Sequence, residues 1–117
     1  FPATIAALVD QLVVAGRLPE RLREPAVKLV CEREAASSTA MVEIGVAIPH
    51  ARLEGVDDIV AALAVRGEGV YRWSDALPIS IVVLVLSSPR LTSEHLSFLS
   101  SLSMLLQSER VRQYLKE

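Results

Sequence analysis

The first third of the chain has the hydrophobic spacing of amphipathic helices. Between residues 2 and 15, apolar side chains recur every three or four positions and predict one buried face, formed by Ile5, Leu8, Val9, Leu12 and Val13. Gly16 suits the position just after a helix C-terminus. After a charged connector at residues 17–24, Pro25 suits the first turn of a second helix that runs to about Ala35. We expect its inner face to carry Val27, Val30 and Cys31.

The middle of the chain changes to the short apolar runs of β-strands. Residues 44–49 predict a short strand, and residues 59–65 predict a buried one. Residues 70–73 predict a short edge strand, and residues 75–78 predict a turn. The run at 79–86 is almost continuously apolar, which is typical of a central strand covered on both faces.

Helical spacing returns in the last part of the chain. Thr92 or Ser93 suits the N-cap of a helix that runs to about Gln107, and residues 109–116 predict a final short helix. In the longer helix a stripe of leucines is expected to face the core, formed by Leu96, Leu99, Leu102 and Leu106. Helices on both sides of a block of strands predict an α/β fold, a mixed β-sheet flanked by helices, with residues 1–117 as a single domain.

Composition narrows the classes of function. The chain has 117 residues, of which 51% are hydrophobic, enough for one real core. Twelve Lys and Arg against 14 Asp and Glu argue against nucleic acid as a partner. The lone cysteine allows no internal disulfide and fits a cytoplasmic location, and no apolar stretch is long enough for direct membrane insertion. No His or Cys spacing typical of a metal site occurs, and we expect no cofactor.

The two histidines are the candidates for chemistry. Pro49 cannot donate to a strand ladder and biases Ile48 toward an extended conformation, so we expect the strand to stop there with His50 at its exit. His95 falls near the start of the predicted 92–107 helix, where free N–H groups favour an anion. A neutral imidazole with one nitrogen held by a hydrogen bond can accept a phosphoryl group. A histidine after a proline is more often an ordinary loop residue, so the residues alone leave both interpretations open.

Longer motifs around both histidines carry a family resemblance. They read Arg33-Glu34-(x)4-Thr39, then Gly45-Val46-Ala47-Ile48-Pro49-His50-Ala51-Arg52, and finally Ser93-Glu94-His95-Leu96-(x)2-Leu99. This order resembles the EIIA domains of the bacterial phosphotransferase system, of the fructose, mannitol and nitrogen-regulatory type. The resemblance implies an α/β sandwich and a phosphotransferase component. By the same resemblance the chain lacks the N-terminal segment and the final helix usual in the family.

The resemblance also implies roles for individual residues. His50 would accept a phosphoryl group from the phosphohistidine of the carrier HPr and pass it to an EIIB component. His95 and Arg33 would stabilise that group, Thr39 would be a supporting hydroxyl, and Arg52 is a further candidate. Two alternatives stay open: a nitrogen-type regulatory module that controls a transporter, kinase or transcription factor by phosphorylation-dependent binding, and a binding module whose site has decayed.

Overall fold

A single buried strand, β6 (Ile81–Ser87), forms the centre of the computed structural model, which describes residues 1–74 and 77–117. All seven of its residues are buried. Because side chains alternate along a strand, β6 supplies two separate clusters of the core. One face of the sheet receives Val82, Leu84 and Leu86, and the opposite face receives Ile81, Val83 and Val85. The predicted central strand is therefore confirmed.

The strands beside β6 make the sheet mixed. β1 (Val46–Ala47) and β2 (His50–Arg52) pair with it in parallel, one after the other along the same side. β3 (Ile59–Val65) pairs with it antiparallel on the opposite side. β4 (Tyr71–Ser74) and β5 (Leu77–Ile79) form a separate antiparallel pair. The α/β class predicted from the sequence is confirmed.

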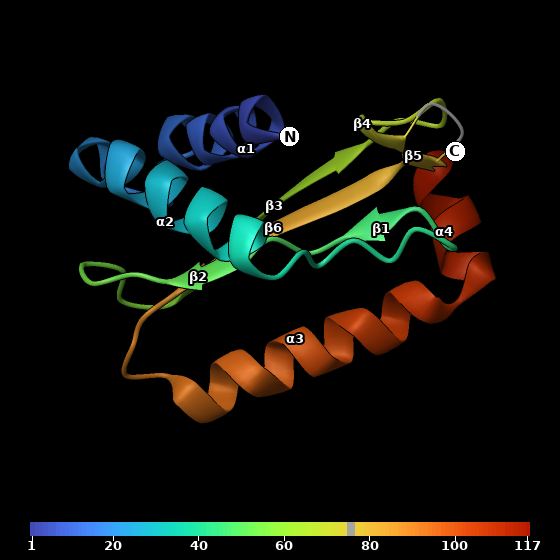
Figure 1. The fold of residues 1–117 in the computed structure, drawn as a ribbon. Coiled ribbons are helices and arrows are strands. Elements are labelled where there is room, and N and C mark those ends of the chain that lie inside the picture. Colours follow the sequence, from blue (N-terminus) through green and yellow to red (C-terminus); the bar gives the residue numbers. More distant parts are fainter. Residues whose placement is uncertain (75–76) are drawn as a thin grey trace.

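Helices cover both faces of this sheet, as Figure 1 shows. α1 (Pro2–Val14) and α2 (Arg23–Ala36) lie on one face, and α3 (Thr92–Gln107) lies on the other. α4 (Glu109–Lys116) follows α3 beyond the end of the sheet where β4 and β5 lie. Among the described residues, none of these helices is both long and apolar enough to cross a membrane.

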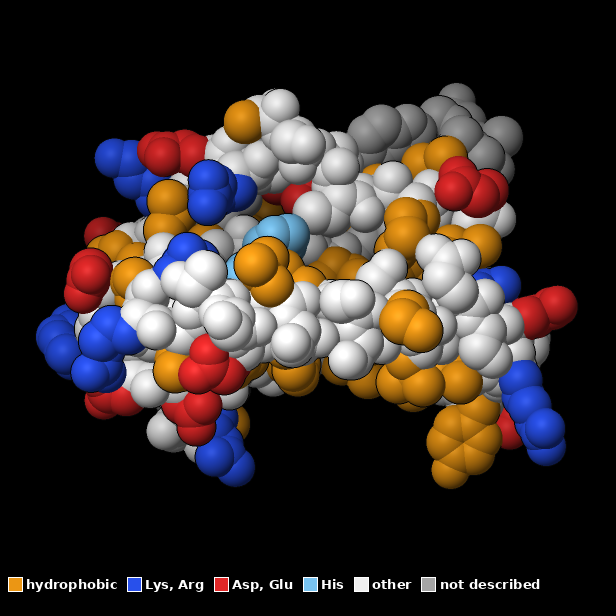
Figure 2. Space-filling view, turned by 90° about the horizontal axis from the view of Figure 1, so that it is seen from below, with side chains coloured by type: hydrophobic (Ala, Val, Ile, Leu, Met, Phe, Trp, Pro, Cys, Tyr) orange, Lys and Arg blue, Asp and Glu red, His pale blue; other side chains and the backbone are white. Residues whose placement is uncertain are grey.

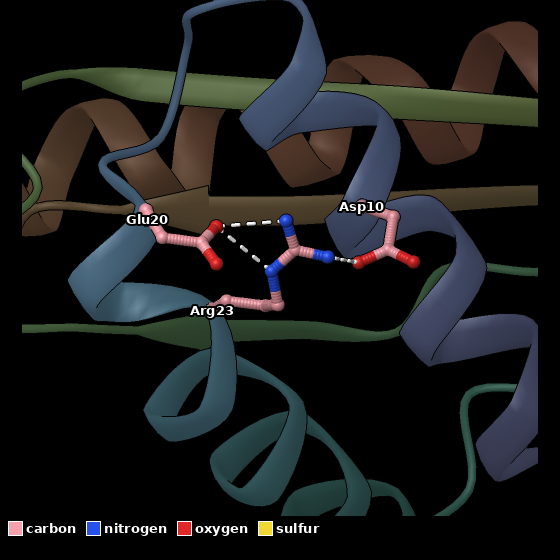
Figure 3. A network of polar contacts seen from close by, with 3 residues as sticks. All are labelled: Asp10, Glu20 and Arg23. Carbon is pink, nitrogen blue, oxygen red and sulfur yellow. Dashed lines mark hydrogen bonds and ion pairs between the residues drawn. The ribbon is translucent and has the colours of Figure 1, made fainter.

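The connector between α1 and α2 is held by a small ionic network (Figure 3). It contains a 3-10 turn, Glu20–Leu22. Arg23 donates through Nε and Nη2 to Oε2 of Glu20, at 2.9 and 2.7 Å, and through Nη1 to the carboxylate of Asp10. These side chains are exposed, so the network orients the first turn of α2 more than it stabilises the fold.

Two helix predictions need correction. Pro25 lies in the first turn of α2, as predicted, but α2 begins at Arg23, so the connector is two residues shorter than expected. Its buried side chains are Ala26, Val30 and Glu34, whereas Val27 and Cys31 are only half-buried. In α3 the stripe that faces the sheet consists of His95, Leu99, Leu102 and Leu106, and Leu96 is 61% exposed. The N-cap of α3 is Leu91, so neither Thr92 nor Ser93 caps it.

Two strand predictions also need correction. The strand expected at 44–49 is interrupted: β1 ends at Ala47, and His50 begins β2 instead of lying at a strand exit. Pro49 has no N–H, but its carbonyl accepts from Val85 N–H at 3.0 Å, so the chain stays beside β6 across the break. The predicted strand at 59–65 exists as β3, but Ala62 is its one buried residue and most of its other side chains are half-buried. The turn predicted at 75–78 begins outside the described residues.

Candidate functional site

Strand alternation brings polar side chains to one end of the sheet. Ala51 packs into the core beneath α1 and α2, so its neighbours His50 and Arg52 project toward the face covered by α3. Ser87, the last residue of β6, projects to that same face and contacts His95 in the first turns of α3. The polar cluster therefore forms where the parallel strands β2 and β6 end, a place where α/β sheets commonly bind ligands.

The two histidines come together at this end. Their ring centroids are 5.6 Å apart, with an angle of 54° between the ring planes. Figure 2, which views the molecule from the side of α3, shows histidine surface beside Lys and Arg and hydrophobic side chains. Two histidines that lie far apart in the sequence are therefore neighbours in the structure.

The hydrogen bond of His50 selects its tautomer. Nδ1 lies 2.7 Å from the carbonyl oxygen of Ile48. A carbonyl can only accept, so Nδ1 carries the ring proton and Nε2 keeps its lone pair in the neutral ring. A half-buried imidazole with a fixed Nδ1–H and an available Nε2 is the arrangement that a nucleophilic histidine needs.

A buried carboxylate supports this arrangement from behind. Glu34, 8% exposed, accepts hydrogen bonds from Ser38 Oγ at 2.9 Å and from the N–H and hydroxyl of Thr39 at 2.8 and 3.0 Å. The hydroxyl oxygen of Thr39 in turn accepts from Ile48 N–H at 3.0 Å. Thr39 thus donates its hydroxyl proton to Glu34 and accepts from the N–H of Ile48, the residue whose carbonyl accepts from His50.

An open cavity of about 360 Å³ lies in front of His50 and is lined by Arg33, Ser37, Ser38 and Thr39 among others. Arg33, near the end of α2, is exposed, and among the described residues its guanidinium has no hydrogen-bond or ion-pair partner. Its charge still reaches His95, because it is one of the groups that lower the pKa of that ring. The structure therefore brings Arg33, Thr39 and His50 to one cavity.

Arg52 takes a different position from these residues. Its Nη2 donates to the carbonyl oxygen of Pro89 and, at 2.5 Å, to the hydroxyl of Thr92. It therefore joins β2 to the loop and first residue of α3 and does not line the cavity in front of His50. Its positive charge also lowers the pKa of His95.

The surroundings of His95 favour its neutral form. The side chain is 5% exposed, and its pKa lies below the ordinary value of 6.5, first because burial penalises the charged ring. Electrostatic interactions with His50, Arg52 and Arg33 lower the pKa further. A neutral imidazole is therefore held beside His50.

Two residues of the cluster were not singled out as site residues from the sequence. Glu34 stands inside the Arg33-Glu34 motif, and it could have been recognised as a carboxylate spaced like the buried residues of α2. Ser87 ends an apolar strand, and only the position of α3 shows that it contacts His95.

Cys31 remains outside the cluster, half-buried, and burial raises the pKa of its thiol. Within the described part of the chain, no group of three or more His, Cys, Asp or Glu residues could hold a metal ion.

Comparison with known proteins identifies the family. Residues 3–117 match the family model described as phosphoenolpyruvate-dependent sugar phosphotransferase system, EIIA 2. The chain belongs to this family. It is 35% identical, over 99% of its own length and 77% of the relative's, to a protein of Haloferax volcanii named as the PTS system fructose-specific EIIA component. The resemblance seen in the sequence motifs is confirmed, and the chain is a phosphotransferase component.

Solved structures agree with this assignment. The nitrogen regulatory protein IIA-Ntr from Neisseria meningitidis is 28% identical and superposes with a TM-score of 0.70 over 81% of this chain. The alignment spans 65% of the length of the Neisseria protein. IIA mannitol from Escherichia coli, 22% identical, superposes with a TM-score of 0.72 over 99% of this chain and 79% of its own, which supports the fold.

Proposed function

We propose that this chain is a phosphocarrier that accepts a phosphoryl group on Nε2 of His50 and passes it on. The observation that carries this proposal is the hydrogen bond from His50 Nδ1 to the Ile48 carbonyl, which leaves Nε2 as the nucleophilic nitrogen beside an open cavity. Family membership supplies the class of chemistry, phosphotransfer in a sugar system.

The transfer exchanges one nitrogen–phosphorus bond for another. A bond forms between Nε2 of His50 and the phosphorus while the bond to the donor histidine breaks, and the donor ring keeps the electron pair. His50 becomes cationic as it reacts, and the Ile48 carbonyl stabilises that charge through Nδ1–H. Charge on the three phosphoryl oxygens calls for positive groups and N–H donors. In this proposal Arg33 provides positive charge and His95 provides an N–H.

The partners follow from the same chemistry. We take the donor to be a phosphohistidine carrier of the HPr type and the acceptor to be an EIIB component, in a cytoplasmic reaction. The name of the Haloferax relative makes a fructose-type EIIB the first acceptor to test. A regulatory role like that named for the Neisseria protein would use the same histidine. We favour the sugar phosphocarrier because the Haloferax relative, at 35% identity, is named as a fructose-specific EIIA component.

The test is intact-protein mass after incubation with phosphoenolpyruvate, enzyme I and HPr. We expect the wild type to gain one acid-labile phosphoryl group and His50→Ala to gain none. His95→Gln is the matched control, since it alters the neighbouring ring but leaves the acceptor, and we expect slower but complete phosphorylation. A phosphorylated His50→Ala protein, shown to be folded, would contradict the proposal.

The downstream step separates the two roles. Phosphorylated protein is mixed with a fructose-type EIIB, and loss of its phosphoryl group is followed by mass. We expect transfer to EIIB for the sugar phosphocarrier. Phosphorylation by HPr without transfer to any EIIB would instead support the regulatory role.

A further inference from the structure

Ser87 makes a contact that the proposed reaction has not yet used. Its Oγ lies 2.5 Å from Nδ1 of His95, and both side chains are buried, with Ser87 fully enclosed and His95 5% exposed. The contact joins the end of the central strand to the first turns of α3. Ser87 is therefore the residue through which the sheet holds the ring that faces His50.

The direction of this hydrogen bond follows from the partners available to the serine. Among the described residues, Ser87 Oγ has no hydrogen-bond partner other than His95. If Nδ1 of His95 carried the proton, the serine hydroxyl would accept it, and its own proton would be buried without an acceptor. Such an orphaned donor is costly. If the hydroxyl donates to Nδ1, both groups are satisfied.

We propose that Ser87 is a positioning residue that donates its hydroxyl proton to Nδ1 of His95 and so holds His95 as the neutral Nε2–H tautomer. Nε2–H then remains as a hydrogen-bond donor on a ring whose centroid is 5.6 Å from that of His50. Burial and the positive charges of Arg52 and Arg33 oppose a second proton on the ring.

This inference gives the proposed phosphocarrier reaction a specific donor, and it rests on that proposed function for its catalytic meaning. A phosphoryl group on Nε2 of His50 presents only acceptor oxygens, so a neighbouring imidazole helps only through an N–H. The Nδ1–H tautomer of His95 would instead turn a lone pair toward those oxygens. Ser87 therefore determines whether His95 stabilises or repels the phosphoryl group.

The first test is the tautomer of His95 in the wild-type protein, which needs no variant. Long-range ¹H–¹⁵N spectra of the labelled full chain, recorded at a pH above the titration of His95, separate protonated from unprotonated ring nitrogens. We expect Nε2 of His95 to be protonated and Nδ1 to be unprotonated. A protonated Nδ1 would overturn the proposal, whatever the protein does with phosphoryl donors.

The second test is the effect of Ser87→Ala on His95. A donor to Nδ1 stabilises only the neutral ring, so its loss should raise the pKa of His95 in an NMR titration. If Ser87 were instead an acceptor, its loss should lower that pKa, because an acceptor favours the cation. Ser80→Ala, the same change at another buried serine just before β6, should leave the His95 resonances in place. A lowered or unchanged pKa in Ser87→Ala would refute the assignment.

The third test is the rate of phosphoryl transfer to the Ser87 variants. Ser87→Ala should accept a phosphoryl group from phospho-HPr about tenfold more slowly, the effect of one lost hydrogen bond. His50 should remain the acceptor. If Ser87→Ala does not fold, Ser87→Cys keeps a side chain of similar shape with a weaker donor and should move rate and pKa in the same directions. A wild type that accepts no phosphoryl group would reject the proposed function, while the tautomer result would stand by itself.

Discussion

At the scale of the residue, hydrogen bonds determine which protons of the site are already used. Nδ1–H of His50 donates to the Ile48 carbonyl, and the hydroxyl of Thr39 donates to Glu34. Both assignments follow because the acceptors have no proton to give. Neither proton is then available to a group in the cavity, whereas Nε2 of His50 and the guanidinium of Arg33 have no hydrogen-bond partner among the described residues.

Thr39→Val tests the chain of hydrogen bonds behind His50. The variant keeps the shape of the side chain but leaves Ile48 N–H without its acceptor and Glu34 without one donor. We expect the free energy of unfolding to fall by about 1–3 kcal/mol, measured by urea denaturation. Thr4→Val in α1 is the control, with an expected change within about 0.5 kcal/mol. Equal effects at the two positions would mean that the Thr39 hydroxyl does not support the site.

The buried His95 predicts a pH dependence of stability. Its pKa is lowered in the folded protein, so as pH falls below about 6.5 the unfolded chain takes up a proton that the folded chain does not. Stability should therefore fall with pH in this window, by at most about 1.4 kcal/mol per pH unit for one proton. Denaturant titrations between pH 7 and 5 measure the slope, and His95→Gln should reduce it. The same slope in both proteins would show that His95 titrates alike in the two states.

At the scale of the element, helix α3 combines packing and chemistry on one stripe. His95, Leu99, Leu102 and Leu106 face the sheet, whereas Leu96 points outward. The sequence spacing allowed a stripe that began at Leu96, since Leu96 and His95 are adjacent and both lie at helical intervals from Leu99. The sheet face decides between them, because Ser87 offers a hydrogen-bond partner to the imidazole at that place.

Two leucine substitutions test this orientation of α3. Leu106→Ala removes a side chain that is 1% exposed, and we expect a loss of about 2–5 kcal/mol in the free energy of unfolding. Leu96→Ala is the matched control on the same helix, 61% exposed, and should change stability by no more than about 0.5 kcal/mol. Chemical denaturation of both variants measures the difference, and a reversed order would mean that α3 packs with its other face on the sheet.

At the scale of the whole molecule, the site depends on segments that lie far apart in the sequence. The end of α2 supplies Arg33 and Glu34, β2 supplies His50, and α3 supplies His95. Arg52 joins two of these segments, since its guanidinium reaches the Pro89 carbonyl and the Thr92 hydroxyl. Arg52 therefore helps to hold the start of α3, which carries His95, against β2, which carries His50.

Arg52→Met tests this connection. The variant keeps the apolar stem but loses both hydrogen bonds, so the start of α3 should open more often. We expect amide hydrogen exchange at residues 89–95 to quicken about tenfold, measured by mass spectrometry, while exchange in α1 stays the same. Arg66→Met, which removes an exposed pair with Glu68 in a turn, should leave residues 89–95 unaffected. Unchanged exchange in Arg52→Met would mean that the loop holds α3 without this side chain.

The sequence by itself determined the elements and the candidate chemistry. Periodicity placed α1, β6 and α3 to within a few residues, because each buries a regular stripe or a continuous apolar run. Motifs around His50 and His95 pointed to the EIIA family, which the comparisons confirm. Local patterns carry this information because apolar spacing acts over a few neighbouring residues.

Only the tertiary structure decided which groups meet and in which protonation state. β2 follows Pro49 because β6 lies beside it, and β3 is mostly half-buried, with Ala62 as its one buried residue. The partners of Ser87 and Arg52 lie in other elements, so no local pattern could assign them. Those of Glu34 lie only four and five residues ahead of it, at Ser38 and Thr39. The contacts of Ser87 with His95 and of Arg52 with Thr92 exist only because packing brings separate elements together, which local sequence does not determine.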